Sequence, residues 1–480
     1  MTLSRRNFLI GSAAAGGGLA VGFWLWRRRR LRSSDPRPDA YIRIGSDDRI
    51  ALIVDESEMG QGVTTALPMI LAEELDADWS KVSYEQAPLD PARFGDQWTA
   101  SSTSVRRGYE PLRRAGAAAR EMLVAAAAQQ WGVPASECTT RESVVHHQAS
   151  GRSARYGEVA EAAAKLPVPD QPRLKDRSQF QIIGTSRPRL DLPAKVDGSA
   201  VFGIDVKVPD MLVAQVEHAP VFGASVASVD AKAAEAVAGV RRVAVIPTGV
   251  AVIADHFYAA QQGRKALAVT WNEGAGRELS SEGIESMLTG AVTAGEAPGG
   301  EALRDDGDAG DAIAGAATRV EATYVAPYLA HAPMEPLNCT AHVTDGACEI
   351  WVPSQSPIGV RETAAEVLGI APERVTVHTT LLGGGFGRRG AQDFVIDALH
   401  ASKAAGAPVK VIWTREDDVR GGHYRPAAVS QMAGGLDAEG WPVAWQHAFS
   451  LPTSRPESGG ALELPYAIPN VRVTGVARPL

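Results

Sequence analysis

Cysteine and histidine are scarce in this chain of 480 residues, which contains three cysteines and ten histidines. Cys138, Cys339 and Cys348 form no C-x-x-C pair, so the chain alone cannot ligate an iron–sulfur cluster or build a disulfide framework. The histidines include no H-E-x-x-H motif, and the neighbours His146 and His147 point apart on any regular element. A zinc site is therefore not expected.

Basic residues are also in deficit once the amino terminus is set aside. Residues 1–32 contain seven arginines and no acidic residue, and removing those seven from the 48 basic residues leaves 41 against 56 acidic residues, a net charge of −15. Nucleic acid is therefore not an expected partner, because no basic excess is left to neutralise phosphates. No internal repeat or low-complexity tract is present, and the length predicts about three domains.

The amino terminus itself is distinctive. Arg5 and Arg6 follow Ser4 and precede an apolar run over residues 8–26. This arrangement is typical of a twin-arginine export signal, so residues 1–34 are expected to be a signal or an anchor and the protein to be periplasmic. Because this export route carries folded proteins, it favours a chain that acquires a bulky redox cofactor or a partner subunit in the cytoplasm.

Cleavage of this segment and its retention as a membrane anchor both stay open. The run over residues 8–26 approaches the roughly 20 residues that span a bilayer, although its glycines and alanines make it a weak span. Residues 27–30 are all arginine, so no clean small-residue cleavage site follows the run.

Hydrophobic periodicity predicts a mixed α+β fold. A strand or hairpin is expected over residues 41–54, helices over 62–75 and 109–131, and short strands alternating with helices over 195–271. The predicted organisation is a first segment over 40–170, a compact mixed domain over 180–275, a linker over 276–315 that is rich in glycine, alanine and acids, and a final α/β block over 316–480.

The segment GGGFGRRG admits a nucleotide-binding interpretation. Gly385, Gly387 and Gly390 satisfy G-x-G-x-x-G, after an expected strand over 375–382 and before an expected helix over 391–405. On this pattern an NAD-dependent dehydrogenase stays an alternative. Two observations weigh against it: the strand alternates with threonines and a histidine, whereas a central parallel strand is nearly all apolar, and such a fingerprint normally opens its domain.

Seven segments together resemble one known family. They are ESEMGQGVTTALPMILAEELDADW (56–79), AAREMLVAAAAQQWGV (118–133), KVDGSAVFGIDVKVPDMLVAQVEHAP (195–220), HAPMEP (331–336), SQSP (354–357), LGGGFGRR (382–389) and TREDDVRGGHYRP (414–426). Over nearly the whole chain they are similar to the molybdenum hydroxylases, the xanthine dehydrogenase and aldehyde oxidase family. Within it they most resemble the large subunits of isoquinoline 1-oxidoreductase and of related exported aldehyde and N-heterocycle dehydrogenases.

The resemblance implies a fold, a cofactor and partners. Residues 180–275 would form the α/β hammerhead domain, and the flanking segments would build molybdopterin-binding α/β domains of which the second half is incomplete. The cofactor would be molybdopterin cytosine dinucleotide carrying molybdenum, with iron–sulfur clusters on a separate small subunit and a cytochrome or quinone as electron acceptor. The implied activity is oxidative hydroxylation of a small aromatic N-heterocycle or an aldehyde with oxygen from water.

The same resemblance implies which residues bind the cofactor. A backbone amide beside Phe386 would donate to an oxo ligand, Gln355 would donate to another exposed oxygen, and glycines would let amides approach the pyrophosphate. The residues at the start of the first helix would hold the pterin or its phosphate at the positive helix end. The expected cofactor-binding residues are Gly60, Gln61, Gly62, Gln355, Gly384, Gly385, Phe386, Gly387 and Arg388.

Each of these assignments has a purely structural alternative. Gln355 could be a surface glutamine, Phe386 a core aromatic residue and Gln61 a helix-start cap, and Arg388 and Arg389 could be solvated. The cofactor assignment requires residues 56–133 to pack against residues 320–480, so that Gln61, Gln355 and Phe386 line one cavity. The hydroxyl-rich loop over 99–104 matches a stretch that lines the cofactor in the resembled family.

The catalytic residue stays unassigned. In the resembled family the general base is a glutamate in a Gly-x-Gly-Glu segment near the carboxyl end of a considerably longer chain, and no such segment occurs in this sequence. If turnover showed that the base lies within this chain, Glu296 and Glu335 would be the candidates for substitution. Residues 471–480 are expected to be frayed or aggregation-prone unless another chain covers them. An inactive or half-complete remnant that binds partners therefore stays open beside the hydroxylase and the NAD-dependent enzyme.

Overall fold

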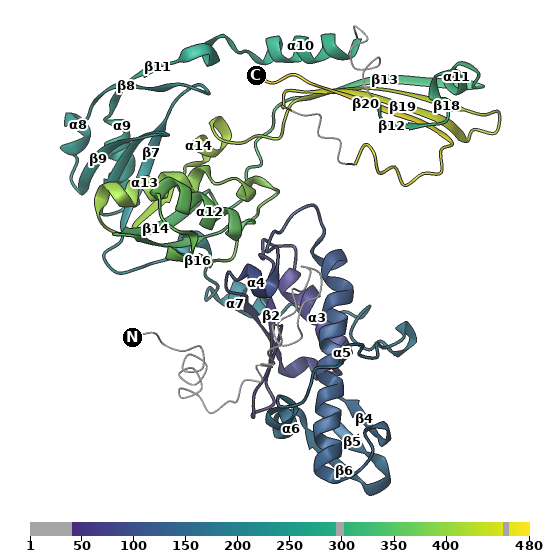
Figure 1. The fold of residues 1–480 in the computed structure, drawn as a ribbon. Helices are drawn as coiled ribbons and strands as arrows, with labels where there is room; N and C mark the ends of the chain where they lie inside the picture. The colour runs from purple at the N-terminus through teal and green to yellow at the C-terminus, as the bar shows by residue number, and fades with distance from the viewer. Residues whose placement is uncertain (1–40, 294–301, 455–459) are drawn as a thin grey trace.

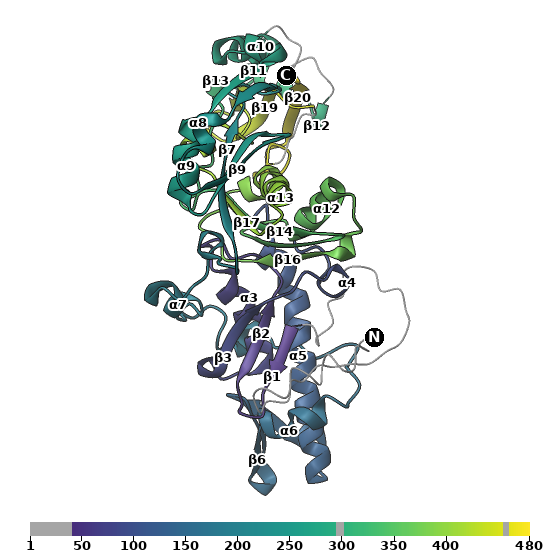
Figure 2. The same ribbon diagram turned by 90° about the vertical axis from the view of Figure 1, so that its left-hand side faces the viewer.

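Five β-sheets organise the part of the chain that the computed structural model describes, residues 41–293, 302–454 and 460–480. Figures 1 and 2 show an elongated arrangement, with the amino-terminal unit at one end, a seven-stranded sheet in the middle and a five-stranded sheet at the other end. The expected export signal, with Arg5 and Arg6, lies outside the described residues, as does Glu296. Within the described ranges no helix is long and apolar enough to cross a bilayer.

The amino-terminal unit is a three-stranded sheet covered by two helices. β1 (Ile42–Ile44) and β2 (Ile50–Val54) form the expected antiparallel hairpin, and β3 (Val82–Gln86) pairs parallel with β2 after the crossover helix α3 (Val63–Leu75). The second helix, α5 (Ser104–Trp131), begins five residues before the expected start. The unit is completed by α4 (Pro91–Phe94), β4 (Cys138–Arg141), β5 (Val144–His147), β6 (Arg152–Arg155) and α6 (Tyr156–Ala163).

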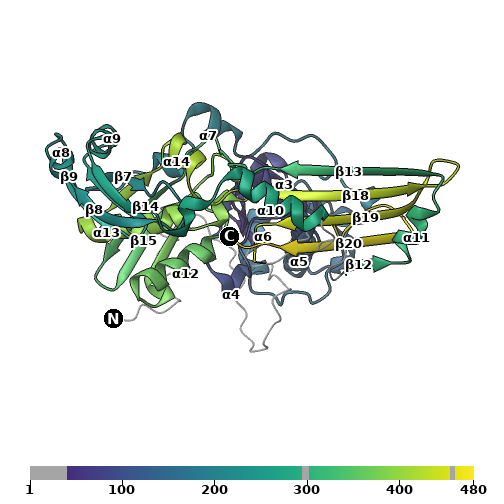
Figure 3. The same ribbon diagram turned by 90° about the horizontal axis from the view of Figure 1, so that it is seen from above.

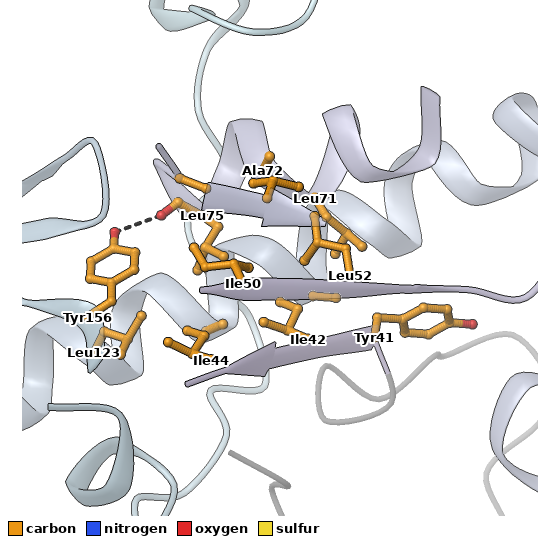
Figure 4. Close-up of a cluster of buried hydrophobic side chains, with 14 of the residues drawn as sticks. Tyr41, Ile42, Ile44, Ile50, Leu52, Leu71, Ala72, Leu75, Leu123 and Tyr156 are labelled. Carbon is orange, nitrogen blue, oxygen red and sulfur yellow. Dashed lines mark hydrogen bonds between the residues drawn. The ribbon is translucent and has the colours of Figure 1, made fainter. Parts of the chain in front are cut away.

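Alternating strand residues and one helix face build the core of this unit. Figure 4 shows Ile42, Ile50 and Leu52 directed toward Leu71 of α3, as the two-residue period of a strand and the 3.6-residue period of a helix require. The hydroxyl of the fully buried Tyr156 donates to the carbonyl of Leu75 at 2.7 Å. That bond satisfies a backbone acceptor at the carboxyl end of α3.

The seven-stranded sheet joins residues far apart in the sequence. Its strand order is β16-β15-β14-β17-β7-β10-β9, and the parallel pairing of β17 with β7 connects the two parts. The strands are β7 (Leu212–His218), β9 (Val240–Ile246), β10 (Gly249–Ala254), β14 (Asn338–Thr344), β15 (Ala347–Val352), β16 (Val375–Thr379) and β17 (Val409–Ile412). Residues 180–275 therefore do not form a self-contained sheet, contrary to the expectation of a compact domain there.

The burial of β7 gives the physical reason. Ala214 and Gln215 are both fully buried although they face opposite sides of the sheet, so both faces of β7 are covered, and its two edges pair with β10 and β17. α12 (Pro357–Leu368) and α13 (Asp393–Ala405) cover one face, and α9 (Phe257–Lys265) packs on the other, where Gly263 lies against Val252. β8 (Ser225–Asp230) and β11 (Ala268–Asn272) pair separately.

One of the short strands expected over residues 195–271 is not found. The strand expected within residues 201–208 is absent, and its centre is a 3-10 turn, η5 (Gly203–Asp205), where Pro353 and Asn338 lie too close to Gly203 for a side chain. The short helices α7 (Leu192–Asp197), α8 (Lys232–Glu235) and α14 (Arg415–Arg420) complete the connections.

The five-stranded sheet projects away from the rest of the chain, as seen from above in Figure 3. Its order is β12-β20-β19-β18-β13, with α10 (Ser281–Thr293) and α11 (Ala309–Ala314) packed on it. The strands are β12 (Ala302–Asp306), β13 (Thr318–Ala326), β18 (Ala428–Leu436), β19 (Pro442–Leu451) and β20 (Asn470–Ala477).

This sheet overturns two expectations. The segment expected as a linker over 276–315 contains α10, β12 and α11, because Leu288 and Val292 recur at helical spacing and are buried against Val429 of β18. The expected fraying of residues 471–480 is also wrong for most of that segment. β20 is an interior strand between β12 and β19, and Val471 and Val473 are fully buried.

Replacing Gly116 with alanine is expected to lower the free energy of unfolding by about 1–3 kcal/mol. A Cβ at Gly116 of α5 would lie 2.5 Å from the carbonyl oxygen of Leu71 and 2.9 Å from the Cβ of Glu74, both in α3. That clash outweighs the gain of up to about 1 kcal/mol that alanine brings to a helix interior. Gly290→Ala in α10, where nothing lies within 4 Å, is the matched control and should stabilise. Urea unfolding measures both, and equal effects would contradict the close α3–α5 packing.

Candidate cofactor site

The first and last parts of the chain meet at two glycine-containing loops. The amide of Leu382 donates to the carbonyl of Glu58 at 3.0 Å, and the Ser57 hydroxyl donates to the carbonyl of Ser354 at 2.8 Å. These bonds cross about 300 residues of sequence and are buried. The expectation that residues 56–133 pack against residues 320–480 is therefore confirmed.

Gln355 is buried and forms hydrogen bonds with both Thr99 and the glycine-rich loop. It is only 2% exposed, which excludes the surface alternative. Its Nε2 donates to the carbonyl of Thr99 at 2.8 Å, its Oε1 accepts from the amide of Gly387 at 3.0 Å, and its own carbonyl accepts from the amide of Thr99 at 3.0 Å. The side chain therefore holds the glycine-rich loop in place through Oε1. Of its two Nε2 hydrogens, one is used by Thr99 and the other is left to donate to a ligand.

The glycines of the loop over 383–390 serve two different purposes. At Gly385 a Cβ would lie 2.6 Å from both Met59 Sδ and Gln355 Oε1, so this glycine permits close packing of the protein on itself. Gly384 and Gly387 have φ of 95° and 96°, which favour glycine, and nothing lies within 4 Å of a Cβ built on Gly387.

Phe386 has a strained backbone and an exposed ring. Its φ is 56°, rare for an aromatic residue, and the residue is 59% exposed, which excludes the core alternative. Arg425 holds the strained position by donating to the carbonyl of Phe386 at 3.1 Å. Such strain persists only where surrounding contacts enforce it, and it concentrates at ligand sites.

Three successive backbone amides of this loop, those of the half-buried Gly384, the buried Gly385 and the exposed Phe386, are not engaged by the described part of the protein. Within the described part of the chain, no residue accepts a hydrogen bond from the amides of Gly384, Gly385 or Phe386. The amides on either side are engaged, since Gly383 donates to Glu335 and Gly387 to Gln355. Successive free amides form a concave site that attracts anionic oxygens.

At the start of α3, a carboxylate of the protein itself takes the position that was expected for the pterin or its phosphate. The Glu58 carboxylate accepts hydrogen bonds from the amides of Gly60, Gly62 and Thr64 at 2.8, 3.1 and 3.1 Å. Burial opposes ionisation of Glu58, but the bonds from Thr64 and Gly62 outweigh it, so the pKa of this carboxyl is lowered. The positive helix end is thus already neutralised by the protein itself.

Gln61 holds its own loop in place. Its Oε1 accepts from the amide of Met59 at 2.7 Å, and its Nε2 donates to the carbonyl of Ser57 at 2.9 Å. The residue is exposed and does not cap the helix, whose cap position is Gly62. Direct contacts from Gly60, Gln61 and Gly62 to a cofactor stay a prediction.

Arg388 and Arg389 are buried and paired within the protein. Arg388 is 2% exposed, donates twice to Asp393 at 2.6 and 2.8 Å, and lies over the ring of Trp413. Its charge is therefore already balanced, which weakens the expected contact with a cofactor phosphate. Arg389 is fully buried and donates to the carbonyl of Gly384 at 2.8 Å, so it supports the glycine-rich loop from beneath.

Glu335 fixes the position of Arg389, and its role was not recognised from the sequence. Its carboxylate accepts from Arg389 Nη2 at 3.0 Å, from the amides of Gly383 and Ile204 at 2.8 and 3.0 Å, and from Asn338 Nδ2 at 2.9 Å. A carboxylate with four donors is a structural centre and is not free to act as a base. The HAPMEP segment that contains it was the available signal.

The topology contradicts the dinucleotide-binding interpretation of GGGFGRRG. β16 precedes the glycine-rich loop, α13 follows it, and β17 comes next, but β15 and β14 lie between β16 and β17 in the sheet. A dinucleotide-binding unit pairs its two parallel strands directly across the sheet. β16 is instead an edge strand, with Thr376 and His378 exposed.

Comparison with known proteins adds independent findings. Two regions, residues 6–246 and 296–477, match families described as molybdopterin cofactor-binding domains. The chain is 35% identical to isoquinoline 1-oxidoreductase subunit beta of Brevundimonas diminuta, covering 90% of this chain and 62% of that protein. It is 33% identical to a membrane-bound aldehyde dehydrogenase of Gluconacetobacter polyoxogenes, covering 94% and 61%.

A solved structure supports the fold. The aldehyde oxidoreductase of Desulfovibrio gigas matches 67% of this chain and 42% of its own, with a TM-score of 0.50 and 21% identity. The mixed α+β fold expected from the sequence is thus confirmed. The chain spans about three fifths of the length of the two curated relatives named above.

Replacing Glu335 with glutamine is expected to lower the free energy of unfolding by about 3–5 kcal/mol, because Arg389 is then a buried charge without its counter-ion. The double variant Glu335→Gln/Arg389→Met should recover part of that loss, since it removes the unpaired charge as well. Glu110→Gln, in an exposed pair with Arg114, is the control and should cost less than about 0.5 kcal/mol. Urea unfolding that shows a loss below about 1 kcal/mol for Glu335→Gln would refute the central role of this carboxylate.

Proposed function

The chain belongs to the molybdenum hydroxylase family as a molybdopterin-binding subunit, and on this premise we propose that it is the large subunit of an exported oxidoreductase that hydroxylates an N-heterocycle or an aldehyde with oxygen from water. The named relatives support this range of substrates, since one is an isoquinoline oxidoreductase subunit and another an aldehyde dehydrogenase. The twin-arginine sequence at Arg5 and Arg6 supports export.

The observation that carries the proposal is the row of three free amides at Gly384, Gly385 and Phe386, where the two matched regions of the chain meet. Molybdopterin cytosine dinucleotide fits this donor set, because its metal end and its pyrophosphate present anionic oxygens. When bound, the cofactor supplies a two-electron oxidation. The chain's own task is to hold those three donors in place, through Gln355 from one side and Arg389 from below.

The cysteines support a separate iron–sulfur subunit. Cys339 and Cys348 are buried, and burial raises the pKa of Cys339 well above its usual range and that of Cys348 to about 12. Cys138 lies against the core of the amino-terminal unit, whereas Cys339 and Cys348 lie in the core of the central sheet, so the three thiols are not brought together as the four ligands of a cluster must be. We infer that electrons leave through clusters on a small partner subunit and then reach a cytochrome or a quinone.

Cofactor retention tests the proposal through Gly387. The full chain, produced together with its small subunit in cells that make the cofactor, is expected to contain molybdenum and to release the cytosine nucleotide on hydrolysis. Gly387→Ala adds roughly 1–2 kcal/mol of backbone strain at φ 96°, which corresponds to about a five- to thirtyfold weaker retention. Gly440→Ala, at a φ of 85° in the exposed turn before β19, is the matched control and should retain molybdenum fully.

Two measurements distinguish an active hydroxylase subunit from an inactive remnant. They are the molybdenum content and the turnover of isoquinoline, nicotinate and simple aldehydes with a dye acceptor. Molybdenum without turnover would support the inactive remnant. A wild-type preparation that contains neither molybdenum nor pterin would overturn the proposed function.

Export is tested separately. Arg5→Lys together with Arg6→Lys should leave the chain in the cytoplasm, because the twin-arginine route requires the arginine pair. Arg29→Lys together with Arg30→Lys conserves the same charges and is the control. Cell fractionation followed by immunodetection measures both, and unchanged export of the first variant would show that the pair is not the signal.

A further inference from the structure

Two adjacent carboxylates, the half-buried Asp55 and the buried Glu56, lie next to Thr99, the residue that holds Gln355. Glu56 is 8% exposed, and its Oε2 accepts a hydrogen bond from the Thr99 hydroxyl at 2.6 Å. Asp55 accepts from the hydroxyl of Tyr41 at 3.0 Å. Glu56 makes no direct contact with the glycine-rich loop described above, and its link to that loop is the hydrogen bond from Thr99.

Thr99 connects Glu56 to the glycine-rich loop. Its hydroxyl donates to Glu56 and accepts from the amide of Ser57 at 2.8 Å, so it is held on two sides. Its backbone exchanges two hydrogen bonds with Gln355, whose Oε1 in turn accepts from the amide of Gly387. Three consecutive contacts therefore run from the Glu56 carboxylate to the loop with the free amides.

We propose that Glu56 is a positioning residue whose protonation state sets the glycine-rich loop through Thr99 and Gln355. As a carboxylate it accepts from the hydroxyl of Thr99, and the Ser104 hydroxyl lies near enough to lower its pKa. As a carboxylic acid it is a weaker acceptor and carries a hydrogen of its own to donate, so the charge-assisted hydrogen bond from Thr99 weakens or reverses. Its effect on catalysis rests on the proposed function, whereas the coupling to the loop exists without a cofactor.

The surroundings place this change near neutral pH. Burial raises the pKa of Glu56 to about 7, hydrogen bonds from Thr99 and Ser104 oppose that rise, Asp55 adds to it and Arg107 of α5 lowers it. The hydrogen bond from Tyr41 lowers the pKa of the neighbouring Asp55, and the charge of Arg93 lowers the pKa of Tyr41. A carboxyl whose pKa is higher in the folded chain than in the unfolded chain favours folding at low pH, and that contribution is lost as pH rises toward 7.

Two measurements on the full chain without cofactor test the proposal. Glu56→Gln mimics the protonated form. Its melting temperature should therefore equal that of the wild type at pH 5 and exceed it by roughly 2–4 °C at pH 8.5. Trp98 precedes Thr99, and its ring lies 2.9 Å from a Cβ built on Gly390 at the end of the loop. The fluorescence of Trp98, obtained by subtracting a Trp98→Phe variant, should show a pH transition near 7 in the wild type and none in Glu56→Gln.

Thr99→Val separates positioning from simple stability. It keeps the side-chain volume but removes the hydroxyl, so Glu56 still titrates and the melting temperature keeps its pH dependence, while the Trp98 transition should disappear. Glu362→Gln, at an exposed position of α12, is the control and should change neither measurement. The same Trp98 transition in Glu56→Gln, or none in the wild type, would overturn the proposal. Either result leaves the molybdenum content, and so the proposed function, untouched.

Discussion

The Glu335 carboxylate with its four donors is the interaction on which the cofactor site depends. Taking a carboxylate and a guanidinium out of water costs several kcal/mol for each ion, and this cost is offset only when every hydrogen-bonding position is filled. Here Arg389, Gly383, Ile204 and Asn338 fill them. Because Ile204 lies 131 residues, and Gly383 and Arg389 lie 48 and 54 residues, from Glu335 in the sequence, the position of the glycine-rich loop depends on long-range contacts.

A second buried carboxylate does the same for the opposite loop. Glu58 receives three amides at the start of α3 and is paired with Arg189 at 3.1 Å. Both glycine loops are therefore held by charges that belong to the protein. Preorganisation of this kind means that a ligand meets donors already in position and need not order them. It also explains why free amides remain at Gly384, Gly385 and Phe386: their neighbours are fixed by other partners.

Features that depend on the local sequence pattern could be predicted, whereas features that depend on contacts between distant residues could not. The hairpin at residues 42–54, α3 and α5 follow from periodicity, and the seven segments identified the family correctly because each is specific only in combination with the others. The expected linker failed because its glycines and acids concealed the helical spacing of Leu288 and Val292. The separate domain failed because sheet membership depends on β17, which lies about 200 residues after β7.

The site shows the same division. The glycine motifs marked the correct loops, but the roles of Glu58, Glu335 and Asp393 depend on which donors the fold brings to them, and no spacing encodes that. From the sequence Arg388 could contact a cofactor phosphate or be solvated, whereas in the structure this buried guanidinium pairs with Asp393, five residues away. Sequence patterns therefore indicate where backbone can approach a ligand more reliably than which charges remain available to it.

The shared sheet ties the glycine-rich loop to residues 212–218 through one further contact chain. Trp413 lies beneath Arg388, donates to the buried carboxylate of Asp397 at 2.9 Å, and contacts the ring of His218 at the end of β7 with 4.7 Å between centroids. Burial lowers the pKa of His218, but the charge of Asp397 outweighs it and the pKa is raised, so a cation is favoured there. The loop is thus held from the amino-terminal unit through Thr99 and from the central sheet through Trp413. A displacement of the amino-terminal unit therefore reaches the loop through the buried hydrogen bonds between Thr99 and Gln355, and a displacement of the central sheet reaches it through the buried Arg388.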